Sequence, residues 1–497
     1  MRRLCSLILT ATAGALVGVL ILAARALPPS PPPSLGSAPA DFRPPPGALE
    51  RLAAAIRVPT VSRDYPATAP AFDALHELLR EAFPRVHATL QQERVAGHTL
   101  LYTWHGRDAS APALLLLAHQ DVVPVDDERL PHWQQPPFDG VNADGYLWGR
   151  GTLDDKSSLM AQLEAAEALL GDAFVPPQTI YLVFGHDEEV SGSGAAAVAA
   201  LLAERGTRIG MVLDEGLTLT EGVFPGVNRP VALVGVAEKG YLNLTLRASA
   251  AGGHSSMPPQ DTAIGRLAAA LDAVRTHPMP ARMETPVADM LRSVGGERSW
   301  LQRVALGNLW LFEPLVRSEL ARTPAGGAML RTTVTPTILR AGLKDNVLPQ
   351  SAEAVLNARL LPGDSSDAVV AHLHTAIDDP AIEILPATEV REATPVSETS
   401  GTAFRALSDR IVEVFPDALV APGLMMGGTD ARHFVTLSRH VYRFQPVRIT
   451  LADLPRFHGD DERIAPAAYE DMIRFYAVLM RGAIGDGGAA AATPGTP

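Results

Sequence analysis

The chain has 497 residues, of which 47% are hydrophobic, so it can bury the cores of two domains. Its formal net charge of -13, without any basic stripe, argues against nucleic-acid binding. The single cysteine, Cys5, lies in an N-terminal apolar run, which excludes cysteine catalysis and a disulfide framework within the chain.

The N-terminal residues predict export. Two arginines precede an uncharged run, residues 4–24, which as a helix is long enough to cross a ~30 Å hydrocarbon core. This charge pattern favours a cytoplasmic N-terminus with the remaining chain in the periplasm or outside the cell. We interpret residues 1–26 as a retained signal anchor, or alternatively as a signal peptide cleaved at Ala-Arg-Ala to give a secreted protein. Proline-rich residues 27–46 predict a stiff linker, and residues 485–497 a flexible tail.

The first candidate site residue follows a predicted strand, residues 114–117. The chain continues Ala-His-Gln-Asp, so the strand delivers His119 at its C-terminal end, where open α/β sheets bind ligands. Asp121 can point the same way as His119 and hold the imidazole in one tautomer. Alone, such a histidine is more often a satisfied, partly buried side chain, so the interpretation depends on the segments that follow.

Asp154 lies in a glycine-bracketed turn before a predicted helix, residues 157–170. A carboxylate at this entrance could bridge two cations. The alternative is an N-cap aspartate that stabilises the helix.

Two more predicted strands are followed by acids. Residues 179–184 lead to Glu188 and Glu189, whose side chains diverge, so one can ligate a metal while the other reaches for its bound water. A solvated acidic turn is the alternative for this pair. The strand 211–213 is expected to end at Asp214, the third such ending, which argues against chance. The pattern indicates a two-metal hydrolase.

The order of elements changes after this third strand. The periodicity predicts β-α-β-β-α-β, typical of a ferredoxin-like domain inserted into the sheet domain. The six predicted elements are residues 241–250, 263–274, 330–339, 352–361, 368–377 and 381–385. The predicted domain limits are 47–238 and 394–484 for the two parts of the catalytic domain, and 239–393 for the inserted domain.

Two long motifs carry a family resemblance: residues 185–192, Gly-His-Asp-Glu-Glu-Val-Ser-Gly, and residues 252–259, Gly-Gly-His-Ser-Ser-Met-Pro-Pro. Over residues 47–480 the chain resembles the zinc peptidase and amidohydrolase family M20, which includes aminoacylase, glutamate carboxypeptidase and succinyl-diaminopimelate desuccinylase. It is most similar to the branch that holds carboxypeptidase S and the secreted N-fatty-acyl-amino-acid synthase/hydrolase. The resemblance implies an α/β catalytic domain with a mixed central sheet flanked by helices, plus an inserted α+β lid or dimerisation domain.

The resemblance also implies two zinc ions per chain. His119 and Asp214 would hold one ion, and Glu189 and His458 the other. Asp154 would bridge both. Histidine nitrogens and carboxylate oxygens suit zinc, although cobalt or manganese would accept the same ligands.

Further residues take roles through the same resemblance. His254 would polarise the scissile carbonyl, within one chain or across a homodimer. Asn346 and Arg359 would bind a substrate carboxylate, and the glycine-rich loop with Gly428 and Thr429 would cradle it. The alternatives are a loop histidine, an ordinary surface salt bridge for the arginine, and an ordinary turn. Residues 278–327 form an insertion expected to cover the lid surface used for dimerisation elsewhere.

These roles predict a dizinc hydrolase that cleaves the amide of N-acyl amino acids or the last peptide bond of short peptides. Glu188 would be the general base that activates a zinc-bound water, and Asp121 would orient His119. The substrate is a small molecule with a free carboxylate. One alternative is an inactive binding module, but such scaffolds usually lose a ligand or the base. Another is a dizinc aminopeptidase, which would need an acidic pocket for a substrate amine, whereas Arg359 and His254 suggest an anion.

Overall fold

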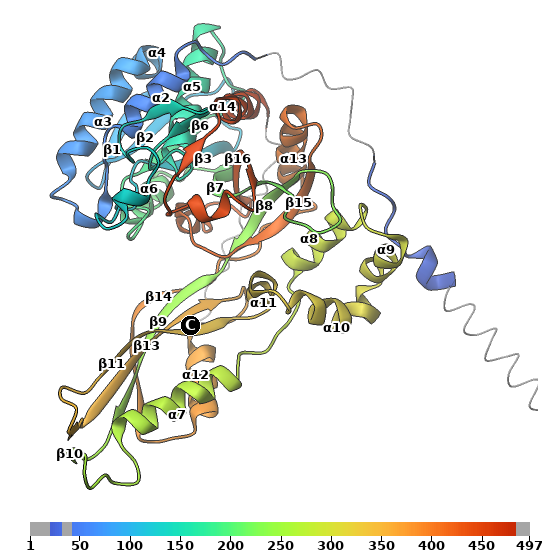
Figure 1. Cartoon of the computed structure of the whole chain (residues 1–497). Helices are drawn as coiled ribbons and strands as arrows, with labels where there is room; N and C mark the ends of the chain where they lie inside the picture. Colours follow the sequence, from blue (N-terminus) through green and yellow to red (C-terminus); the bar gives the residue numbers. More distant parts are fainter. Residues whose placement is uncertain (1–19, 32–41, 484–497) are drawn as a thin grey trace, which may run out of the picture.

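The computed structural model describes residues 20–31 and 42–483 (Figure 1). The chain forms an α/β domain around an eight-stranded mixed sheet and an elongated second domain inserted into it. Residues 1–19, 32–41 and 484–497 lie outside the description, and with them most of the predicted anchor, half of the linker and the tail. Among the described residues, no helix is both long and apolar enough to span a bilayer.

The main sheet has the strand order β1-β2-β6-β3-β7-β16-β8-β15. Its central strand β3 has the sequence Ala-Leu-Leu-Leu-Leu-Ala-His, and all seven residues are buried, as expected for a strand covered on both faces. β3 runs parallel to both of its neighbours, β6 and β7. The eight strands are β1 (Gln91–Val95), β2 (Thr99–Trp104), β3 (Ala113–His119), β6 (Ile180–Gly185), β7 (Ile209–Glu221), β8 (Val231–Glu238), β15 (Leu419–Met425) and β16 (Val441–Thr450).

Helices cover both faces of this sheet and enclose two apolar cores. The larger core lies under α2, α5, α13 and α14, and the smaller one under α6 and the short helix η3. The helices are α2 (Ala48–Ile56), α3 (Ala69–Ala82), α4 (Pro84–Thr89), α5 (Lys156–Gly171), α6 (Ser193–Glu204), α13 (Thr402–Val414) and α14 (Pro466–Arg481). Short 3-10 turns are η1 (Ser62–Asp64), η2 (Leu130–His132), η3 (Asp430–Phe434) and η4 (Leu454–Arg456), and a small sheet joins β4 (Val141–Ala143), β5 (Tyr146–Trp148) and β17 (Arg463–Ile464).

The catalytic-domain elements predicted from the sequence are confirmed with one correction. β3, α5 and β6 match the expected ranges to within a few residues. The strand expected to end at Asp214 instead continues as β7 to Glu221. The prediction of an end here was wrong because β7 keeps pairing with β16 beyond Asp214, through a register shift over Glu215 to Leu217.

The inserted domain is a four-stranded antiparallel sheet in the order β11-β13-β9-β14. Alternate residues of β9 and β13 are buried because α7 and α12 cover one face of this sheet. The elements are β9 (Gly240–Ser249), α7 (Ala263–Thr276), β11 (Thr333–Ala341), β13 (Ser351–Leu360), α12 (Ser366–Ile377) and β14 (Ile382–Arg391), with a two-stranded ribbon of β10 (Gly253–His254) and β12 (Val347–Leu348). This is the predicted β-α-β-β-α-β order, whereas a lid or dimerisation role stays a prediction.

The insertion within residues 278–327 forms helices that pack on the main sheet (Figure 1). Val287 and Leu291 of its first helix share an apolar cluster with Val231 of β8 and Ala421 of β15. The expectation that the insertion covers a surface of the inserted domain was wrong, because its apolar helix face packs against the β8–β15 edge of the main sheet instead. The helices are α8 (Thr285–Gly295), α9 (Trp300–Gly307), α10 (Leu309–Leu320) and α11 (Pro324–Leu330).

Candidate metal centre and substrate pocket

The candidate site lies at the carboxyl edge of three adjacent strands, β6, β3 and β7. His119 is the last residue of β3, and Glu188 and Glu189 follow the end of β6. Parallel strands end at the same edge of a sheet, so the residues at the ends of β3 and β6 meet residues of β7 there, although the three segments are far apart in the sequence.

Asp154 is the centre of the cluster. Its Oδ1 lies 2.9 Å from His119 Nε2, and its Oδ2 lies 3.0 Å from His458 Nε2. His458 Nε2 also lies 3.2 Å from Glu189 Oε2. Asp154 does not cap α5, since Asp155 occupies the N-cap position. The predicted bridge therefore has the right surroundings, and the capping alternative does not describe this carboxylate.

Two groups with metal-ligand character share Asp154. One joins it to Glu189 and His458, and the other joins it to His119 and Glu215, with the ligand atoms of each group within 4.8 Å of one another. Glu189 Oε1 is buried and has no hydrogen-bond partner, a situation that a cation would relieve. The donor set of histidine nitrogens and carboxylate oxygens therefore fits two divalent ions.

Glu215 stands where the sequence predicted Asp214. The Asp214 carboxylate accepts a hydrogen bond from the Ala431 amide at 2.7 Å and belongs to neither group of ligand atoms. Glu215 faces the cluster because side chains alternate along β7. The next residue, Gly216, has φ 133°, and an added Cβ would lie 2.9 Å from Arg443 Cβ, so this bend requires glycine.

Asp121 connects the histidine with the glutamate pair. Its carboxylate lies 3.3 Å from His119 Nδ1, and its carbonyl oxygen lies 2.9 Å from the same nitrogen. The same carboxylate accepts hydrogen bonds from the amides of Glu188 at 3.2 Å and Glu189 at 3.0 Å. Asp121 thus orients one predicted ligand through its ring and the acidic turn through its backbone.

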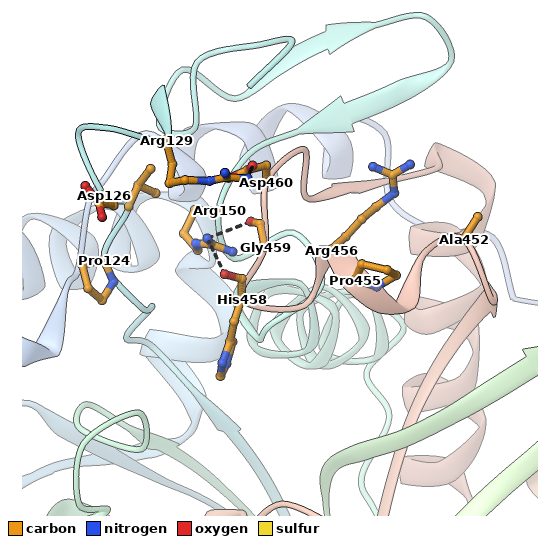
Figure 2. A pocket seen from close by; sticks show the side chains of 11 residues that line it. Pro124, Asp126, Arg129, Arg150, Ala452, Pro455, Arg456, His458, Gly459 and Asp460 are labelled. Atoms are coloured by element: carbon orange, nitrogen blue, oxygen red, sulfur yellow. Dashed lines mark hydrogen bonds and ion pairs between the residues drawn. The ribbon is translucent and has the colours of Figure 1, made fainter. Parts of the chain in front are cut away.

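Arg150 and Glu462 hold together the two loops that carry Asp154 and His458. The buried Arg150–Glu462 ion pair measures 2.6 Å, and Arg150 also donates to the His458 carbonyl oxygen at 3.3 Å (Figure 2). Glu462 accepts the Asp154 amide at 3.1 Å. A hollow of about 450 Å³ adjoins these two loops, and the other arginines that line it form ion pairs with acidic side chains. Figure 2 shows that the His458 ring is directed away from this hollow.

Burial and crowding of charge perturb the acid–base behaviour of the cluster. Burial raises the pKa of Glu188, and the nearby Asp430 carboxylate raises it further. Burial and the Asp154 charge likewise raise the pKa of Glu215. Hydrogen bonds to Asp154 and Glu189 raise the pKa of His458 to about 10. Buried carboxylates crowded together in this way are typical of a cation site.

A pocket of about 570 Å³ opens from this cluster. Its polar end holds Arg359 and Arg391, and Gly428 lies on its wall. The remaining wall is largely apolar. It is formed by Leu217, Val223, Leu233, Met425, Ile449, Leu454 and Phe457.

The two pocket arginines flank one tyrosine. Tyr241 of β9 pairs in register with Arg359 of β13 on one side and with Arg391 of β14 on the other. The guanidinium carbons lie 4.6 Å and 4.7 Å from the tyrosine ring centroid. Arg359 makes no ion pair among the described residues, so the salt-bridge alternative does not account for it. Burial lowers its pKa, as expected for a cation held away from water.

Thr429 does not present its side chain to the pocket. Its hydroxyl donates to Glu238 Oε1 at 2.6 Å, and the fully buried Arg443 donates to the same oxygen at 2.6 Å. The Thr429 side chain therefore fixes the glycine-rich loop to β8. Of the two residues predicted in this loop, Gly428 is the one that lines the pocket.

His254 and Asn346 lie at the far tip of the inserted domain (Figure 1). The ten-residue strand β9 leads from Tyr241 at the pocket towards this tip, a distance of roughly 30 Å at 3.3 Å per residue. His254 is exposed, and Asn346 accepts a hydrogen bond from the neighbouring Ser255. In this arrangement the tip of the inserted domain points away from the pocket, so His254 lies far from the cluster of its own chain, and its catalytic role stays a prediction.

The geometry agrees with comparisons to known proteins. The model of "Peptidase family M20/M25/M40" matches residues 115–482. The chain belongs to this family. It is 40% identical over 441 residues to "Probable carboxypeptidase S-like 2" of Dictyostelium discoideum, covering 87% of this chain and 84% of the relative. It is 37% identical over 441 residues to "N-fatty-acyl-amino acid synthase/hydrolase PM20D1" of Homo sapiens, covering 87% of each protein.

A solved structure shows the same fold. The M20 family metallo-carboxypeptidase Sso-CP2 from Sulfolobus solfataricus superposes with a TM-score of 0.64 at 19% identity, over 87% of this chain and 98% of that protein. The predicted family and fold class are thereby confirmed. The chain is a hydrolase of a metal-dependent peptidase family.

Sequence reasoning missed several residues of the site. Glu215 could have been found from the triplet Asp-Glu-Gly, because the glycine signals a bend that changes the direction of the preceding side chain. Arg391 and Tyr241 carried no local signal, since only the sheet register brings them beside Arg359. The Arg150–Glu462 pair spans more than 300 residues and has no signature in the sequence.

Proposed function

We propose that this chain is a dizinc hydrolase that cleaves the amide bond of N-acyl amino acids or the C-terminal peptide bond of short peptides. One observation carries the proposal: a single pocket joins the paired acid–histidine groups, two arginines and an apolar wall. These three features match the scissile amide, the free carboxylate and the acyl or side chain of such a substrate.

The metal assignment differs from the sequence prediction at one ligand. We propose that His119 and Glu215 hold one ion, and that Glu189 and His458 hold the other. Asp154 bridges both ions, and the Asp214 carboxylate instead accepts the Ala431 amide hydrogen bond. When bound, two zinc ions would supply Lewis-acid polarisation of the scissile carbonyl and a more acidic water.

Glu188 is the proposed general base. It belongs to the pocket wall and is not part of either ligand group, and its Oε1 lies 3.6 Å from the Arg432 guanidinium. It takes a proton from the attacking water and delivers it to the leaving amine. Its raised pKa suits both steps, because an ordinary glutamate would be a weaker base.

Arg359 and Arg391 are the proposed carboxylate site. Tyr241 holds both guanidinium groups at the pocket, so their rotamers are restricted before substrate arrives. A planar guanidinium can pair with a carboxylate through two parallel hydrogen bonds. The backbone at Gly428 can approach the same carboxylate, while Thr429 fixes the loop.

The apolar wall favours an acyl chain over a charged amine. Residues such as Leu217, Leu233 and Phe457 offer no partner for an ammonium group, which an aminopeptidase would have to bind. Named relatives include both a carboxypeptidase S-like protein and an N-fatty-acyl-amino acid synthase/hydrolase, so both substrate classes enter the test. The retained ligand groups and base disfavour an inactive binding module.

We propose that His254 and Asn346 act on the substrate bound by a second copy of the chain. His254 is exposed at the lid tip, and we propose that in a homodimer it polarises the scissile carbonyl in the partner's pocket. Asn346 lies beside it and would reach the same substrate. We also propose export, with the N-terminal apolar run as a retained anchor or, alternatively, a cleaved signal.

The test is release of free amino acid from a panel of substrates by the zinc-loaded full chain. The panel pairs N-acetyl with N-dodecanoyl amino acids, dipeptides, and the carboxamide of each. The expected result is turnover of the free acids, faster with the long acyl chain, and little turnover of the amides. Glu188→Gln should abolish turnover, and the exposed Glu204→Gln should not. No turnover despite two bound ions would contradict the substrate assignment, and cleavage only of substrates with a free α-amine would favour an aminopeptidase.

A further inference from the structure

An apolar surface without a partner among the described residues lies on the insertion helices α9 and α10. It consists of Trp300, Leu301, Trp310, Leu311 and Leu315, whose exposed fractions run from 47% to 72%. Of the five tryptophans in the chain, the other three are no more than 8% exposed. Placing both exposed tryptophans on two contacting helices costs solubility unless something covers them.

The N-terminal chain enters the fold beside this surface (Figure 1). The Asn308 side chain, between α9 and α10, donates to the Leu22 carbonyl oxygen at 3.0 Å, and the Leu27 amide donates to the Arg303 carbonyl oxygen at 3.1 Å. Leu27 also packs in the apolar cluster under α8. The described end of the apolar run, residues 20–24, therefore lies beside the helices that carry the exposed tryptophans.

The docked N-terminal turn adds its own apolar side chains to that face. Leu20 is 60% exposed and Ile21 is 50% exposed. Arg25, exposed at the end of the run, is a cation of the kind that reaches from a hydrocarbon boundary to lipid phosphates. Cleavage after Ala26 would remove Leu22 and its bond with Asn308, so the inference below rests on the proposed retention of the N-terminal run.

We propose that α9, α10 and the turn at residues 20–25 form a docking face for a phospholipid bilayer. Tryptophan suits the boundary between headgroups and acyl chains, because its ring is apolar while its N–H needs a polar partner. Leucines from two short helices add apolar area at the same depth. Two elements, the N-terminal run and this face, then hold the chain in one orientation at the membrane. With the linker as its only attachment, the catalytic domain would be free to reorient.

The test is quenching of tryptophan fluorescence in the full chain reconstituted into phosphatidylcholine vesicles with brominated acyl chains. Bromine quenches only tryptophans at the bilayer, so the expected result is partial loss of emission compared with unbrominated vesicles. In Trp300→Phe/Trp310→Phe that loss should disappear. The matched control Trp104→Phe, which alters a buried ring, should keep it.

Folding of each variant is checked by its hydrolysis of a water-soluble N-acetyl amino acid, because none of these tryptophans belongs to the pocket. Absence of bromine quenching would overturn the proposal. Quenching by acrylamide in water then distinguishes two alternatives. Tryptophan rings that acrylamide quenches face water, whereas rings protected from it are covered by residues 1–19 or by a second copy of the chain. Equal bromine quenching in the double variant would overturn the proposal as well.

Discussion

The edge of the main sheet and the tip of the inserted domain both carry residues that specific motifs predicted, yet only the first set lies at the candidate metal cluster. His119 lies 2.9 Å from Asp154, and His458 lies 3.0 Å from Asp154 and 3.2 Å from Glu189. His254 and Asn346 lie next to each other but far from that cluster. Residues on neighbouring strands of one sheet converge because strand pairing fixes them, whereas residues on a separate domain are placed by domain orientation and by assembly.

The largest expected effect is at the sheet edge. Glu188→Gln should lower kcat by about 10²–10⁴-fold, the usual contribution of a general base, while both metal ions remain bound. Steady-state kinetics with metal analysis of the same sample measures both quantities. Retained activity in this variant would contradict the proposed role of Glu188 in proton transfer and the assignment of this sheet edge as the catalytic site.

The lid tip should matter nearly as much if it acts in a dimer. His254→Ala should lower kcat by about 10²–10³-fold, as for other donors to a developing oxyanion, whereas the exposed His374→Ala should have no effect. Refolded mixtures of His254→Ala with Glu188→Gln should regain activity, because a mixed dimer has one intact site. Mixtures that stay inactive would show that the tip does not complete a partner's pocket.

The arginines at the base of the lid should give a smaller, substrate-dependent effect. Arg359→Ala or Arg391→Ala should lower kcat/KM by about 10–100-fold, the value of a charged hydrogen bond, and mainly through KM. Arg340→Ala, on the exposed edge strand β11, is the matched control. The loss should vanish with substrates whose carboxylate is amidated, and an equal loss with those substrates would indicate a structural role.

The smallest effect is a pH dependence of metal binding. Because the pKa of His458 is raised to about 10 in the metal-free protein, this ring carries a proton at pH 8 that a metal must displace. Zinc affinity should therefore fall about tenfold for each proton displaced and each unit by which the pH is lowered. Calorimetry in two buffers of different ionisation heat should show proton release, reduced in His458→Gln. Binding without any proton release would contradict the assignment of this ligand.

The sequence predicted well what depends on local pattern. Apolar runs located β3 and β6, and the acids and histidine after them marked the site, because a sheet gathers its strand ends. It named Asp214 and missed Glu215, since alternation along β7 and the bend at Gly216 determine which side chain faces the cluster. Register places Arg391 beside Tyr241, and apolar packing carries the insertion to the main sheet. These are long-range choices without a local signature.

The central claim is a two-ion centre built on Asp154, and metal stoichiometry tests it most directly. Elemental analysis of the zinc-saturated, desalted chain should give two ions per chain, fewer in Glu215→Gln, and two in Asp214→Asn. Asp154→Asn should reduce binding of both ions, because both groups share its carboxylate. Fewer than two ions in the unaltered chain, or two tightly held ions in Asp154→Asn, would contradict the account.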